Sequence, residues 1–232
     1  MTKEKEMLNI LEQGIKQTIP GLSDAARDTL VSRMEQYIKE IILFNSAYNL
    51  TNTSDHDELV VRHILDSLAG YEIIKKYADK FAANGTPVVM GDIGSGGGLP
   101  GVPLAAAFDC DGVSVQFKLV ERMEKRCAFL ENCAAILGLK NVTVVNSEAE
   151  RVDAEAYDLI TFRAFRPLDK KMTKTLLRIV KNGGCLCAYK AKAASIKEEM
   201  DGIAALVPQY EVVPLAVPGL EDSERNLVII RK

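Results

Sequence analysis

Strand-like and helical patterns alternate along the chain after Pro87. Such alternation predicts crossover units, which pack into a doubly wound, mostly parallel sheet with helices on both faces. We expect strands at residues 88–92, 114–121, 141–145, 157–162, 184–190, 209–217 and 227–231. Helical segments cover residues 99–108, 124–137, 168–181 and 195–206, and residues 148–156 have no clear pattern. No helical segment separates the last two strands, so we expect an antiparallel pair at the sheet edge.

The part of the chain before Pro87 shows helical periodicity alone. Ser23 is a favourable N-cap residue, and apolar residues recur after it at helical spacing. Polar turn residues interrupt this pattern over residues 44–52, before a second helical segment over residues 57–77. We therefore expect an N-terminal helical extension at residues 1–82, packed on a core at residues 83–232 as one compact unit.

Composition narrows the class of protein. Apolar residues make up 47% and charged residues 26% of the chain, which is ordinary globular usage. The N-terminus lacks the apolar stretch of a signal peptide, and the longest uncharged stretch, residues 93–108, is too short for a membrane span. We expect a cytoplasmic protein without a membrane partner.

The five cysteines do not have the spacing of a metal site. There is no C-x-x-C pair, and only two histidines are present to complete a zinc site. Cys127 and Cys133 fall in a helical segment, and Cys185 and Cys187 alternate on one face of a strand. We expect small buried apolar side chains in a reducing compartment, and no metal.

A glycine-rich loop, DIGSGGGLPG at residues 92–101, joins the first predicted strand to a helix. Glycines allow a sharp turn and a ligand's close approach, and the helix N-terminus offers free N–H groups. The Rossmann dinucleotide pattern would need a third glycine where Leu99 stands, and a P-loop would need a lysine that is absent. The Asp-x-Gly-x-Gly-x-Gly spacing is instead associated with S-adenosylmethionine, with a purely structural turn as the alternative.

Glu121 ends the second predicted strand, 20 residues after the glycine loop. An acid at this place can accept hydrogen bonds from both hydroxyls of an adenosine ribose. Alternatively, Glu121 begins the following helix, where acidic residues are favoured. Together with the loop, it predicts a site for a nucleoside cofactor.

Three sequence blocks make the prediction more specific: residues 48–51 (YNLT) with 61–67 (VRHILDS), residues 92–101, and residues 163–165 (RAF). With these blocks the chain resembles the bacterial small-subunit ribosomal RNA guanine-N7 methyltransferases, also called glucose-inhibited division protein B. The resemblance implies a class I S-adenosylmethionine-dependent methyltransferase fold, Rossmann-like, with a seven-stranded, mostly parallel sheet and an antiparallel edge pair.

The resemblance also implies site residues. Arg163 and Lys190 are the catalytic candidates, and the cofactor-binding candidates are Asp92, Gly94, Gly96, Leu99, Glu121, Ala149, Glu150 and Arg163. Alternatively, Arg163 is a solvated loop arginine and Glu150 a surface acid. His63 and Asp66, at i and i+3, form either a local structural pair or part of the active site. Asn226 stands where the family pattern leads us to expect His, which weakens any role for this position.

The implied reaction needs no general base, because guanine N7 carries a lone pair and no proton at neutral pH. Our hypothesis is that Arg163 and Lys190 hold the guanine or an adjacent phosphate. The implied partner is 16S rRNA of the small ribosomal subunit, at the 530 loop, with no DNA partner and a monomer as the default. The alternatives are a small-molecule methyltransferase, which the 6% aromatic content disfavours, and a non-catalytic, cofactor-binding ribosome-assembly factor.

Charge is unevenly distributed although the net charge is only −3. Residues 163–197 contain ten basic residues and one acid, Asp169. Local basic fields govern RNA binding, so this segment predicts an RNA-facing surface. Alternatively, part of the segment is only the solvated face of a helix.

Overall fold

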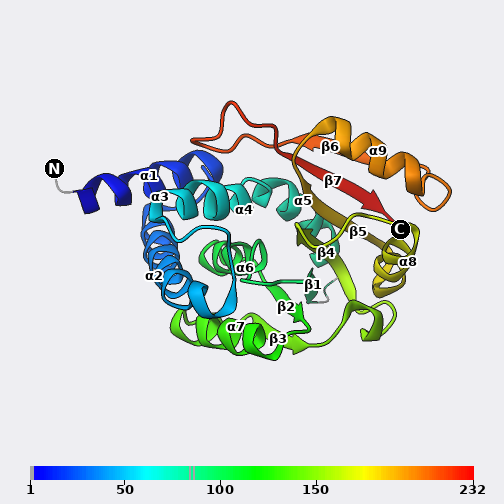
Figure 1. Ribbon diagram of the computed structural model, residues 1–232, viewed down its shortest axis with the longest axis horizontal. Helices are drawn as coiled ribbons and strands as arrows, with labels where there is room; N and C mark the ends of the chain where they lie inside the picture. Colours follow the sequence, from blue (N-terminus) through cyan, green and yellow to red (C-terminus); the bar gives the residue numbers. More distant parts are fainter. Residues whose placement is uncertain (1–2, 84, 86) are drawn as a thin grey trace.

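The computed structural model describes residues 3–83, 85 and 87–232, and they build a seven-stranded sheet in the order β3-β2-β1-β4-β5-β7-β6 (Figure 1). The strands are β1 (Val88–Ile93), β2 (Val115–Glu121), β3 (Val142–Asn146), β4 (Tyr157–Arg163), β5 (Val180–Lys190), β6 (Glu211–Pro214) and β7 (Asn226–Arg231). Strand β7 runs antiparallel to both β5 and β6, and the pairs among β1 to β5 are parallel. The predicted fold class, with its antiparallel edge pair, is confirmed.

The helices after β1 cover the two faces of the sheet. Residues 148–156, which have no clear pattern in the sequence, contain only a short 3-10 helix. The helices are α6 (Gly101–Cys110), α7 (Glu124–Ile136), η2 (Ala149–Arg151), α8 (Lys170–Ile179) and α9 (Ala193–Ile203). Helices α6 and α7 contribute to one buried apolar cluster, and α8 and α9 to a second. Along β5, Cys185 and Cys187 lie in the first cluster while Leu186 and Ala188 lie in the second. The two cysteines are therefore buried on one strand face, as predicted.

Most of the N-terminal helices lie on the side of the molecule away from α8 and α9, while the last of them, before β1, lies beside β4 (Figure 1). The N-terminal helices are α1 (Lys3–Thr18), α2 (Asp24–Tyr48), α3 (His56–Leu59), the π-helix η1 (Val60–Leu65), α4 (Asp66–Leu68) and α5 (Tyr71–Ala82). The Ser23 side chain accepts a hydrogen bond from the Ala26 amide, which confirms the predicted N-cap of α2. The expected break at residues 44–52 starts too early, because α2 continues to Tyr48 and ends on Asn49 in the left-handed conformation.

The predicted helical segment over residues 57–77 is confirmed except for a break at Ala69 and Gly70: α3, η1 and α4 follow one another without a gap, and α5 begins at Tyr71. The Tyr189 hydroxyl donates to the Ser67 carbonyl at 2.6 Å. At Gly70, an added Cβ would lie 2.3 Å from the same hydroxyl oxygen. The tyrosine thus occupies space that a regular helix with an ordinary side chain at residue 70 would need.

One apolar cluster runs through both parts of the predicted division. It contains Leu11 and Ile15 of α1, Tyr37 of α2, and Phe117 of β2. The division between residues 82 and 83 remains a prediction. The two parts on either side of it contribute side chains to the same buried apolar cluster. None of the helices in the described residues is long and apolar enough to cross a membrane.

Candidate active site

The glycine-rich loop follows β1 and has a backbone path that favours glycine. Gly94, Gly96 and Gly98 have φ values of 71°, 56° and 93°, a region that side-chain-bearing residues rarely adopt. The Tyr37 hydroxyl, from α2, donates a hydrogen bond to the Gly97 carbonyl. A residue of the N-terminal helices therefore helps to hold the loop in place.

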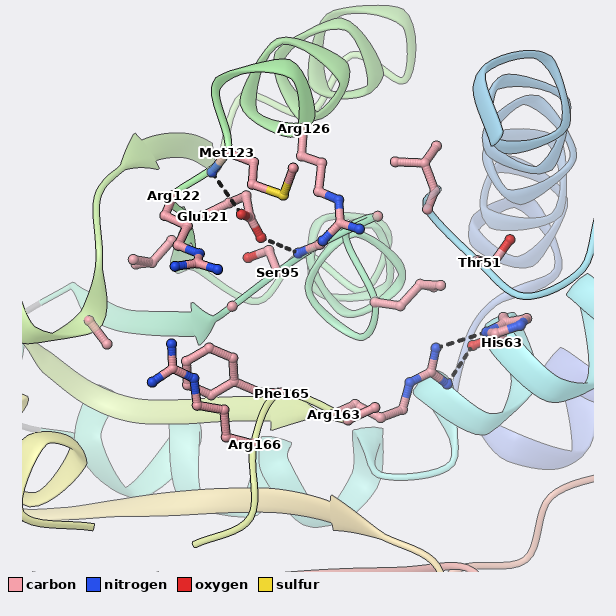
Figure 2. Close-up of a pocket in the computed structure, with 18 of the residues that line it drawn as sticks. Thr51, His63, Ser95, Glu121, Arg122, Met123, Arg126, Arg163, Phe165 and Arg166 are labelled. Carbon is pink, nitrogen blue, oxygen red and sulfur yellow. Dashed lines mark hydrogen bonds between the residues drawn. The ribbon is translucent and has the colours of Figure 1, made fainter. Parts of the chain in front are cut away.

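Glu121 ends β2 and lies against the loop, as the sequence predicts. One carboxylate oxygen accepts from the Gly96 amide at 3.0 Å, and the other accepts from the Met123 amide at 2.8 Å (Figure 2). The residue is only 6% exposed. Each carboxylate oxygen retains a second lone pair, so the pair of oxygens can still accept from two neighbouring hydroxyls.

A cavity of about 590 Å³ lies between the loop, Glu121 and the end of β4. Its volume is in the range of small-molecule sites. Seven of the eight predicted cofactor-binding residues line it: Gly94, Gly96, Leu99, Glu121, Ala149, Glu150 and Arg163. Arg126 also lines the cavity, and its Nε is buried without a hydrogen-bond partner among the described residues.

Asp92 is the predicted cofactor residue that does not line this cavity. It lies behind the loop, 1% exposed, and its carboxylate accepts from the Gly101 amide at 3.2 Å. Burial raises the pKa of Asp92 to about 7. The structure thus places Asp92 in support of the first turn of α6 rather than in the lining.

Sequence reasoning did not single out several lining residues. Leu50 and Thr51 belong to the first family block, and Arg126 reaches the cavity from α7 and donates to the Asn49 carbonyl at 2.7 Å. Phe165 stands in the third block, and its ring lies over Gly94, where a Cβ would be 2.0 Å away. The family blocks contain Leu50, Thr51 and Phe165, whereas no local signal pointed to Arg126, because its contact with Asn49 spans 77 residues of sequence.

Arg163 ends β4 and is held on both sides of its guanidinium. Nη1 contacts the Asp66 carboxylate at 2.6 Å. Nη2 contacts His63 Nδ1 at 3.1 Å (Figure 2). Its side chain is only 14% exposed. The alternative of a solvated loop arginine is therefore wrong.

His63 lies in the π-helix η1, an element that often occurs at functional sites. Burial and the Arg163 guanidinium lower the pKa of His63 to about 4, so the imidazole is neutral at neutral pH. Because Nδ1 accepts from Arg163, the proton is on Nε2, which is buried without a partner among the described residues. The sequence predicts that His63 and Asp66 form either a local structural pair or part of the active site. Both contact Arg163, so they lie together beside the candidate site.

Asp66 joins two arginines that are far apart in sequence. Its second oxygen accepts from Arg225 Nε at 3.0 Å, and the residue is 5% exposed. The sequence did not point to Arg225, which follows the exposed segment before β7. A buried carboxylate with two cationic partners fixes both of them in orientation.

Lys190 and Asn226 line a second cavity, of about 780 Å³, and not the first. Lys190 forms an ion pair with Glu199 at 2.8 Å, and Asn226 donates to the Ala191 carbonyl at 2.5 Å. Arg163 lines both cavities. The structure thus separates the two catalytic candidates, with Arg163 at the boundary and Lys190 on the far side.

Comparison with known proteins gives a consistent result. A family described as rRNA small subunit methyltransferase G matches residues 30–228. A protein named ribosomal RNA small subunit methyltransferase G from Treponema denticola is 38% identical, with 98% of this chain and 96% of the relative covered. A protein of the same name from Treponema pallidum (strain Nichols) is 37% identical, with 91% of this chain and 90% of the relative covered. Another from Cupriavidus necator is 36% identical, with 100% of this chain and 97% of the relative covered. The similarity extends from α2 to β7.

Proposed function

Because the chain belongs to the rRNA small subunit methyltransferase G family, we propose that it uses S-adenosylmethionine to methylate guanine N7 in the 530 loop of 16S rRNA. The observation that carries this proposal is the meeting of three features in one cavity. These are the glycine loop, the buried Glu121 carboxylate and the fixed Arg163 guanidinium. We further propose that the protein acts as a cytoplasmic monomer.

The cavity suits a nucleoside cofactor. The free lone pairs of Glu121 match the two ribose hydroxyls, and a Cβ added at Gly96 would meet no atom closer than 3.8 Å. Ala149 and Glu150, in η2, lie on the side where we place the adenine. When bound, S-adenosylmethionine supplies an electrophilic methyl group on a sulfonium centre.

The acceptor side of the reaction fits an atom that carries no proton. Guanine N7 reacts through its lone pair, so the protein has to position the base rather than remove a proton from it. His63 is neutral, but its Nδ1 lone pair is occupied by Arg163, so it is not free to act as a base. Arg163, fixed between His63 and Asp66, is placed to contact the guanine or its phosphate. Lys190 is a phosphate contact in the second cavity.

The exposed face of α8 provides the basic surface that RNA requires. Lys170, Lys171 and Lys174 are all exposed, and none of them forms an ion pair within the described part of the chain. Helix α8 begins a few residues after Arg163, so this surface starts close to the cavity. It supports the proposed RNA partner.

The function is tested by incubating the purified protein with radiolabelled S-adenosylmethionine and small ribosomal subunits that lack the modification. We expect label in 16S rRNA, at a guanine where borohydride and aniline then cleave the chain. Label in a small molecule alone would instead indicate a small-molecule methyltransferase. Cofactor binding without any transfer would indicate a non-catalytic assembly factor.

A further inference from the structure

The Asn45 side chain, near the end of α2, uses all of its hydrogen-bonding capacity on the segment between α2 and α3. Its Oδ1 accepts from the amides of Leu50 and Thr51, each at 2.9 Å. Its Nδ2 donates to the Thr53 carbonyl and the Ser54 hydroxyl, each also at 2.9 Å. A carboxamide has two acceptor lone pairs and two N–H donors, so all four are used. One side chain thus fixes the path of this segment.

The same segment is held against the glycine loop and α7. Leu50 lies on Gly97, where an added Cβ would be 3.2 Å from both the Leu50 Cβ and the Leu50 carbonyl oxygen. Arg126 Nη2 donates to the Asn49 carbonyl at 2.7 Å. The residues of the segment that line the first cavity, beside Glu121, are Leu50, Thr51 and Asn52. The segment between α2 and α3 is therefore a fixed part of the wall of that cavity.

The segment lies away from the residues that suit an adenosine. Glu121 ends β2, and Ala149 and Glu150 follow β3, at one side of the cavity. Thr51 lies across the cavity from Glu121 and Arg122 (Figure 2). S-adenosylmethionine carries a zwitterionic amino-acid group at the end opposite its adenine. With the ribose at Glu121, that group extends toward the segment between α2 and α3.

We propose that Asn45 is a positioning residue for the methyl donor. It does not line the cavity, but it fixes the wall that receives the amino-acid group of the cofactor. The Arg126 guanidinium suits the carboxylate of that group, and the Asn52 carboxamide can accept from its ammonium. A wall that is already fixed does not have to be ordered when the cofactor binds, which favours affinity. The inference rests on the cofactor of the proposed function and adds the part of the fold that orients it.

A substitution at Asn45 and two probes test the inference. Asn45→Ala removes all four hydrogen bonds and leaves the lining side chains in place. The control is Asn132→Ala, because the half-buried Asn132 of α7 donates to Glu40 of α2 at 3.0 Å and is not among the lining residues of either cavity. Calorimetry gives the Kd of each protein for S-adenosylhomocysteine and for 5′-methylthioadenosine, which has the adenosine and lacks the amino-acid group.

We expect Asn45→Ala to raise the Kd for S-adenosylhomocysteine by at least about tenfold, and the Kd for 5′-methylthioadenosine by less than about twofold. Asn132→Ala should bind both probes as the wild type does. Asn45→Asp still accepts from the two lining amides, so it should show a smaller rise for S-adenosylhomocysteine alone. This variant carries the test if the alanine variant does not fold.

An equal loss of affinity for the two probes would show that Asn45 only maintains the site as a whole, and it would overturn the inference. Unchanged affinity for both probes would overturn it as well. A wild-type protein that binds S-adenosylhomocysteine but transfers no methyl group to small subunits would overturn the proposed function and leave the inference standing. A wild-type protein that does not bind S-adenosylhomocysteine would overturn both.

Discussion

Asp92, which is buried, and His63, which is half-buried, are ionisable residues with opposing effects on stability. Burial raises the pKa of Asp92 from 3.8 to about 7, so the folded protein holds a proton that the unfolded chain releases, and stability falls as pH rises through this range. Burial and Arg163 lower the pKa of His63 from 6.5 to about 4, so stability rises with pH over much of the same range. In the wild-type protein the two slopes oppose each other.

Removing either group should reveal the slope of the other. In Asp92→Asn, the free energy of unfolding should rise from pH 4 to pH 6.5 by on the order of 3 kcal/mol. In His63→Gln it should fall over the same range, because Asp92 alone remains. Urea unfolding of both variants and the wild type, at half-unit steps of pH, measures these slopes. Equal slopes in the two variants would contradict the assignment.

Glu121 is the residue on which we expect cofactor affinity to depend most. In Glu121→Gln the side chain keeps only one acceptor oxygen. Its amide nitrogen would then face the N–H of Gly96 or of Met123, and one contact with the ribose would be lost. We expect the Kd for S-adenosylhomocysteine, measured by calorimetry, to rise by roughly tenfold or more. Glu124→Gln, at the exposed start of α7, is the control and should bind normally.

Arg163 can be removed without stranding its buried partner. In Arg163→Ala, the Asp66 carboxylate keeps its contact with Arg225, so the fold should persist. We expect methyl transfer to small subunits to fall by about a hundredfold or more, with the circular dichroism spectrum unchanged. Arg163→Lys keeps the charge but cannot contact His63 and Asp66 in the same way, and it should recover only a small part of the activity. Full activity in the alanine variant would refute the role of Arg163.

At the scale of elements, the strands and the antiparallel edge pair follow from local patterns, whereas the break at Ala69 and Gly70 does not. Residues 57–77 have helical periodicity throughout, and periodicity cannot show that Tyr189 interrupts them from β5. Likewise, β5 begins at Val180, not at the predicted residue 184, because the Asn-Gly-Gly sequence that resembles a turn lies at an irregularity in its pairing with β4.

The contact between Gly70 and Tyr189 can be tested by a stability measurement. Gly70→Ala puts a methyl group where the Tyr189 hydroxyl lies, so the tyrosine must move and its bond to Ser67 is lost. We expect a loss of about 1–3 kcal/mol in the free energy of unfolding, measured with urea. Gly202→Ala, in α9, has no atom within 4 Å of the new Cβ and should be neutral or slightly stabilising. Equal stability of both variants would contradict this account.

The loop, Glu121 and Arg163 could be predicted because they end neighbouring strands or follow them directly, at the edge where ligands bind in such sheets. The Asp66–Arg225 pair could not be predicted, since 159 residues separate its members and no local pattern relates them. The same is true of Tyr37 and the loop carbonyl that it holds. Long-range contacts of this kind depend on packing.

At the scale of the whole molecule, a local field outweighs the net charge of −3. Replacing Lys170, Lys171 and Lys174 together by Gln should weaken binding of small-subunit RNA and reduce the slope of log K against log salt by roughly 0.7–0.9 per lost phosphate contact. Filter binding at several salt concentrations measures this slope. The control replaces three other exposed lysines, Lys16, Lys39 and Lys140, for the same change in charge. An identical slope in the two triple variants would mean that these lysines of α8 only face solvent and do not contact RNA.

The bond from Tyr37 to the Gly97 carbonyl has a consequence for how the molecule can be divided. The glycine loop belongs to the sheet by sequence, but a helix about sixty residues upstream holds its shape, and Leu50 packs against it. A fragment that starts at residue 83 would carry every glycine of the loop and lack the side chains that hold it. The N-terminal helices therefore belong to the proposed cofactor site, and we expect that they could not be exchanged as an accessory module without rebuilding that site.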